Sequence, residues 1–131
     1  MPIYMKYEGV LGEAKGKYAG WIELYSCQLG ENQPFSSGGS ASVSARSNIS
    51  EITASKYQDT ASTHLMRQSV TGKPAHVTID FVKQGQNVPY IKLELENAMI
   101  TGYRVSGRGA GNGKPVEMFS LNFTKIELVT K

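Results

Sequence analysis

The sequence predicts a mainly β fold, a small bent antiparallel β-barrel with one flanking α-helix at about residues 60–71. Apolar and polar residues alternate through most of the chain, which is the spacing of a strand with two different faces. One segment changes to helical spacing. The apolar positions also slip by one residue inside two long predicted strands, which is typical of a β-bulge or a barrel corner.

The first two predicted strands lie before residue 30. Ile3, Met5 and Tyr7 share one face of the first, and a glycine-rich turn covers residues 9–20. The second strand is expected over residues 19–29. One of its faces carries Trp21, Glu23, Tyr25, Cys27 and Leu29, and the other carries Ile22, Leu24, Ser26 and Gln28. Both faces include apolar groups, so we expect one to meet the core and the other to meet a further surface.

An extended loop is predicted over residues 30–47, where Gly and Ser dominate. A connection of this length inside a compact domain is usually functional or disordered. The next strand is expected over residues 48–57. It leads to Asp59 and Thr60, which are residue types that begin helices. On the predicted helix Ala61, Leu65, Met66, Ser69 and Val70 fall on one side, and Gly72 is placed to end it.

Three strands complete the barrel, over residues 75–84, 90–106 and 116–130. The apolar phase of the middle strand moves from Ile91, Leu93 and Leu95 to Ala98 and Ile100. That of the last strand moves from Phe119, Leu121 and Phe123 to Ile126 and Leu128. A glycine-rich hairpin tip at 107–115 joins these two strands. The chain of 131 residues is expected to form a single domain, residues 1–131.

No catalytic, cofactor-binding or metal-binding constellation is evident, so we expect a protein that is not an enzyme. Fourteen Lys and Arg residues against eleven Asp and Glu give a net charge of +3, spread along the chain, which does not indicate a nucleic-acid surface. The glycine-rich segment at 107–115 lacks the spacing of a phosphate loop. The single Cys27 is expected to be a buried, inert thiol, and the two histidines, His64 and His76, have no metal-ligand spacing.

The N-terminal residues lack the continuous apolar stretch of a signal peptide, and no apolar run approaches the ~20 residues that span a bilayer. We therefore expect a cytoplasmic product without membrane insertion. If it is secreted, export does not use a cleaved signal.

Several blocks in a fixed order resemble one family. They are Gly-Trp-Ile-Glu-Leu at 20–24, Lys-Tyr-Gln-Asp-Thr-Ala-Ser at 56–62, Val-Thr-Gly-Lys at 70–73, Tyr-Ile-Lys-Leu-Glu-Leu at 90–95, and Pro-Val-Glu-Met-Phe-Ser-Leu-Asn-Phe-Thr-Lys-Ile-Glu-Leu at 115–128. In this order and spacing the sequence resembles the haemolysin-coregulated protein (Hcp) family, the tube subunit of type VI secretion systems. The resemblance covers nearly the whole chain.

The resemblance implies a structural subunit whose six copies close into a ring, with rings stacking into a hollow tube. The implied partners are further copies of the chain, a spike protein, a contractile sheath and small effectors carried in the lumen. Strand parity makes Ser26 and Gln28 candidate lumen-facing residues. The loop at 30–47 is the candidate ring-stacking element, through Gln33, Pro34, Phe35, Val43, Ser44 and Arg46.

Two other hypotheses are kept. The first is a small β-barrel binding module, similar to an oligonucleotide-binding fold, that uses Tyr4, Tyr7, Tyr90, Tyr103, Arg104 and Arg108. The second, less favoured, is a hydrolase that uses Cys27 or Glu94 with His76.

Overall fold

A computed structural model describes residues 1–31, 49–85, 88–109 and 113–130. Within these ranges the helices are a 3₁₀ turn, η1 (Gly16–Tyr18), and one α-helix, α1 (Ser62–Thr71). The strands are β1 (Ile3–Tyr7), β2 (Ile22–Leu24), β3 (Ser26–Glu31), β4 (Ile49–Tyr57), β5 (Ala75–Val82), β6 (Pro89–Ser106), β7 (Val116–Asn122) and β8 (Lys125–Thr130). The predicted mainly β architecture with one flanking helix is confirmed.

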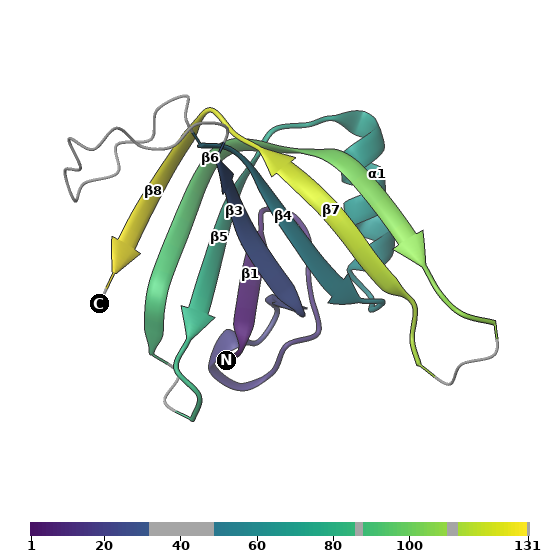
Figure 1. Ribbon diagram of the computed structural model, residues 1–131, viewed down its shortest axis with the longest axis horizontal. Helices are drawn as coiled ribbons and strands as arrows, with labels where there is room; N and C mark the ends of the chain where they lie inside the picture. The colour runs from purple at the N-terminus through teal and green to yellow at the C-terminus, as the bar shows by residue number, and fades with distance from the viewer. Residues whose placement is uncertain (32–48, 86–87, 110–112, 131) are drawn as a thin grey trace.

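Strand β6 belongs to two antiparallel sheets, which gives the fold its bend (Figure 1). Its first half pairs with β5 and β8, and β5 continues through β1 to β2; we call these five strands sheet A. Its second half pairs with β7, which continues through β4 to β3; we call these four strands sheet B. Helix α1 lies beside the second half of β6.

The switch of β6 between sheets occurs at Asn97, where the backbone φ is 54°. Leu93 and Leu95 are buried before it, and Ala98 and Ile100 after it, so the buried side changes from odd to even positions. The pairing with β5 shifts register at the same place. The predicted bulge or barrel corner in this strand is therefore confirmed. The second predicted slip coincides with the break between β7 and β8.

The continuous strand expected over residues 19–29 is wrong. Ile22 and Leu24 face the core in β2, and this strand ends before the exposed Tyr25. In β3 the residue that packs against the core is Cys27, so the core-facing positions change from even numbers in β2 to odd numbers in β3. Tyr25 donates its N–H to the carbonyl of Ser55 at 2.7 Å, so this residue turns the chain from sheet A toward sheet B.

The core lies between the two sheets and under helix α1. Its fully buried side chains include Met5, Ile22, Ile52, Leu65, Ile79, Leu95 and Leu121. These come from both sheets and the helix, so one hydrophobic cluster joins all the layers.

Helix α1 begins and ends close to the predicted positions. The Asp59 carboxylate accepts the N–H of Ala61 at 2.9 Å, just before the first turn. Gly72 ends the helix in the left-handed conformation and donates its N–H to the carbonyl of Gln68. The predicted apolar side is only partly right, because Leu65 is buried whereas Met66 and Val70 are 47% and 81% exposed. No helix in the described ranges is long and apolar enough to cross a membrane.

Candidate functional site

On the side away from the core, sheet B presents mainly small polar side chains, together with Gly102, Met118 and Arg104. The strand register places two rows across it. One row is Gln28, Thr53, Ser120 and Gly102, and the other is Ser26, Ser55, Met118 and Arg104. Residues paired directly across strands lie on the same side of a sheet. We call these eight residues the polar face of sheet B.

The predicted lumen candidates Ser26 and Gln28 both lie on this face. Gln28 is exposed, and the Ser26 hydroxyl lies 2.5 Å from the hydroxyl of Ser55. Ser26 and Gln28 point away from Cys27, as predicted. The expectation that they share a face with Ile22 and Leu24 is wrong, because the core-facing parity changes at Tyr25. The six loop candidates, Gln33, Pro34, Phe35, Val43, Ser44 and Arg46, lie outside the described residues.

A buried polar network joins helix α1 to the other side of sheet B. The Lys56 ammonium, which is 0% exposed, lies 2.8 Å from an Asp59 oxygen and 3.0 Å from a Glu117 oxygen. It also donates to the Ser62 hydroxyl at 3.1 Å. The Tyr103 hydroxyl donates to the same Glu117 oxygen at 2.6 Å. These five residues, which we call the buried network, come from β4, the helix start, β6 and β7.

The electrostatics of the buried network favour a charged Glu117. Burial alone would raise its pKa, but hydrogen bonds with Ser62, Tyr103 and Lys56, together with the lysine charge, hold the pKa of Glu117 below its ordinary value. The pKa of Tyr103 is raised by burial and by its bond to Glu117. Tyr103 therefore stays a neutral donor, and Lys56 and Glu117 form a buried ion pair.

In the sequence, Lys56, Asp59 and Ser62 stand out only as members of the block at 56–62, and their contact with Glu117 is not predicted. Lys56 and Glu117 are 61 residues apart, and a lysine or glutamate at an alternating position is usually exposed. A clue was present in the phase of the strands. Lys56 follows Ile52 and Ala54 on the core side of β4, and Glu117 precedes Phe119 and Leu121 on that of β7.

Of the residues considered for catalysis, the structure brings His76 and Glu94 together but keeps Cys27 apart from both. Burial raises the pKa of the Cys27 thiol to about 12, so the thiol is a poor nucleophile. His76 and Glu94 are 3.7 Å apart, but both side chains are substantially exposed on sheet A, whereas Cys27 packs against the core from sheet B. Among the described residues no three His, Cys, Asp or Glu side chains are grouped as a metal ion would require.

The residues of the alternative binding module are also dispersed. Tyr7 is buried in the core, and Tyr4 stacks on the ring of Tyr18 with centroids 4.4 Å apart. Tyr103 belongs to the buried network, so its ring is not a free stacking platform. Tyr90 lies below the Lys83 ammonium. These tyrosines do not form the continuous aromatic surface that single-stranded nucleic acids require.

Two antiparallel sheets that share one bent strand, with a single helix fixed to one of them, place this chain among the bent β-barrel proteins. The chain belongs to the Hcp family: the family model described as "Type VI secretion system effector, Hcp" matches residues 4–129. It is therefore a type VI secretion system Hcp protein.

Solved structures agree with this fold. Hcp1 from Salmonella typhimurium is similar with a TM-score of 0.81 and 21% identity, over 99% of this chain and 87% of that chain. Hcp1 from Flavobacterium johnsoniae is similar with a TM-score of 0.70 and 14% identity, over 100% of this chain and 97% of that chain. Hcp3 from Pseudomonas aeruginosa, named a secreted protein, gives a TM-score of 0.72 at 16% identity, over 98% of this chain and 90% of that chain. No curated protein matches the chain.

Proposed function

We propose that this protein is a structural subunit of the type VI secretion tube. Six copies close into a ring, the rings stack into a hollow tube, and small effectors travel in its lumen. The observation that carries the proposal is the match of the Hcp family model to residues 4–129, which covers almost the whole chain. The protein acts by assembly and catalyses no reaction.

The polar face of sheet B suits a lumen wall. Seven of its eight residues are uncharged, and most of them are Ser, Thr, Gln or Gly. Short side chains of this kind form hydrogen bonds without a strong electrostatic field, so they hold a passing protein weakly and release it. We propose that Ser26 and Gln28 face the lumen and that the polar face continues around the ring.

The proposed partners follow from the same assembly. The tube binds a spike protein at its tip, a contractile sheath outside and effectors inside, and it leaves the cytoplasm without a cleaved signal. We propose that the loop at 30–47 joins successive rings through Gln33, Pro34, Phe35, Val43, Ser44 and Arg46.

Sizing in solution tests the proposal. Analytical ultracentrifugation across a wide concentration range is expected to show a ring-sized species, and negative-stain electron microscopy is expected to show rings with a central hole. A compact monomer at every concentration, with no larger species, contradicts the proposal. Rings without stacked tubes contradict only the role of the loop.

A further inference from the structure

A cleft of about 590 Å³ opens at one end of the barrel, where β2 leads into β3 and β4 ends. Three carboxylates line it, from Glu13, Glu23 and Asp59, against one lysine, Lys114. Asp59 is already paired with Lys56, whereas no ion pair found among the described residues includes Glu13 or Glu23. A hydrogen bond from the Thr60 N–H to the Glu13 carboxylate lowers the pKa of Glu13, so this residue stays negatively charged.

Two exposed tyrosines stand beside these carboxylates. Tyr25 and Tyr57 line the cleft, are 66% and 49% exposed, and contact each other edge to face with ring centroids 5.3 Å apart. Aromatic faces next to carboxylates recognise cations, and an arginine in particular, because the guanidinium stacks on the ring while its N–H groups reach the carboxylate. We call this site the acidic aromatic cleft.

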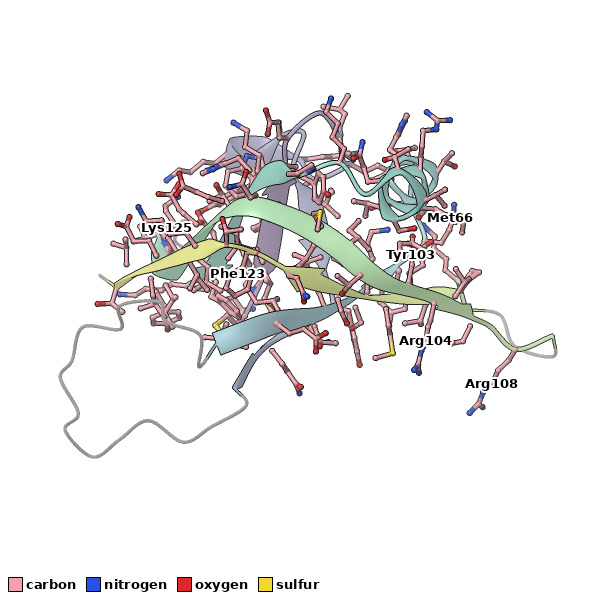
Figure 2. The ribbon with its side chains drawn as sticks, turned by 90° about the horizontal axis from the view of Figure 1, so that it is seen from above. Met66, Tyr103, Arg104, Arg108, Phe123 and Lys125 are labelled. Carbon is pink, nitrogen blue, oxygen red and sulfur yellow. The ribbon has the colours of Figure 1, made fainter. Side chains whose placement is uncertain are left out.

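A basic arm leaves the barrel at the same end. This arm consists of the last residues of β6 and residues 107–109 after it, which extend beyond helix α1 and away from the body of the molecule (Figure 1). Arg104 and Arg108 project from this arm on the side opposite to helix α1, whereas Tyr103 points toward the helix (Figure 2). Both arginines are exposed, and neither side chain forms an ion pair, hydrogen bond or ring contact within the part of the chain that the structure describes.

The geometry points to a contact between neighbouring copies: the basic arm of one copy places Arg108 in the acidic aromatic cleft of the next. This inference rests on the proposed ring assembly and names the surfaces that join its subunits. The arm and the cleft are complementary in charge, and the cleft is large enough for an arginine side chain.

Their positions also favour a closed ring. The Gln58 N–H donates to the carbonyl of Pro115 at 3.0 Å, and Gln58 and Lys114 both line the cleft, so the base of the hairpin adjoins the cleft of its own chain. The basic arm and the acidic aromatic cleft lie at the same end of the barrel. When copies are related by rotation about an axis along the barrel, the arm of one copy is therefore at the same height along this axis as the cleft of the next. A contact between two different surfaces then closes into a ring instead of continuing as an open helix.

Charge reversal tests the contact. We expect Arg108→Glu to raise the concentration at which the ring dissociates by at least ~10-fold, and Glu23→Arg to do the same, because each places like charges in the interface. Arg67→Glu, an exposed arginine on helix α1, makes the same charge change elsewhere and is the matched control; it should leave assembly unchanged. The double variant Glu23→Arg/Arg108→Glu exchanges the charges, so it should recover most of the lost association.

Analytical ultracentrifugation separates the outcomes. If the unmodified chain forms rings and Arg108→Glu behaves like Arg67→Glu, the contact is wrong although the ring assembly holds. If both single variants weaken the ring but the double variant does not recover, Arg108 and Glu23 do not meet, and the inference is again wrong. If the unmodified chain is a monomer at every concentration, the proposed function itself fails.

Discussion

Replacement of Lys56 by methionine should destabilise the fold strongly, because this lysine is the cation shared by two carboxylates. Its ammonium is fully buried, 2.8 Å from Asp59 and 3.0 Å from Glu117, and the Glu117 side chain is 3% exposed. Methionine fills a similar volume but leaves the Glu117 charge buried without a counterion. Removal of one partner from a buried ion pair costs about 3–5 kcal/mol. We therefore expect a decrease of this size in the free energy of unfolding.

Lys125→Met provides the control. Lys125 also lies near a glutamate, at 3.6 Å from Glu96, but its side chain is 67% exposed. Exposed pairs contribute little because water screens both charges. Denaturant unfolding of the two variants at equal protein concentration compares them directly, since assembly adds the same concentration-dependent stabilisation to each. Equal losses for Lys56→Met and Lys125→Met would refute the reasoning.

Four further outcomes are expected. The pKa of Glu117 is lower in the folded chain, so its stabilising contribution is present at neutral pH and is lost as the pH falls through that pKa. Unfolding at a series of pH values should therefore show that Glu117→Gln loses less stability in acid than the unmodified chain. Gly12→Ala should cost about 1–3 kcal/mol, because the new Cβ would lie 2.2 Å from a backbone oxygen, whereas Gly102→Ala, with open space around it, should unfold like the unmodified chain. Gln28→Arg should leave rings intact in ultracentrifugation and change effector retention in pull-down assays; loss of rings would instead place Gln28 in a subunit interface. Shortening the loop from Gln33 through Ser44 to a brief Gly-Ser link should preserve rings and abolish tubes, and normal tubes under the electron microscope would contradict the stacking role.

Strands such as β1 could be predicted because one of their sides is buried along the whole strand. Ile3, Met5 and Tyr7 illustrate this: alternation on a strand with one face in the core gives a clear period of two. The start of the helix was predictable from Asp59, which accepts the N–H of Ala61 just before the first turn, and its end from Gly72, because both contacts are local.

The break at Tyr25 could not be predicted from the same pattern. Residues 21–29 carry apolar groups on both parities, so the sequence fits one continuous strand as well as two strands with opposite phase. What decides between them is the position of β4, which accepts the N–H of Tyr25 through the carbonyl of Ser55. Alternation within a segment does not encode which distant strand will pair with it.

The buried network was missed for a related reason. Its members are polar, and composition alone assigns lysine and glutamate to the surface. Only the pairing of β4 with β7 shows that Lys56 and Glu117 stand directly opposite each other on the core side. Met66 and Val70 show the opposite error. Their helical spacing with Leu65 predicts burial, but in the structure Leu65 faces the core and both of them are exposed.

The two phase slips in the sequence turn out to be one structural feature. Asn97 bends β6 where it passes from sheet A to sheet B, and Thr124 lies at the break between β7 and β8. The Asn97 amide donates to the Thr124 hydroxyl at 3.0 Å, and the Thr124 N–H donates to the carbonyl of Glu96 at 3.1 Å. The two bends therefore lie side by side, and both strands turn together. Since β6 continues from this corner through sheet B to Arg104, the same corner orients the polar face and the basic arm relative to sheet A.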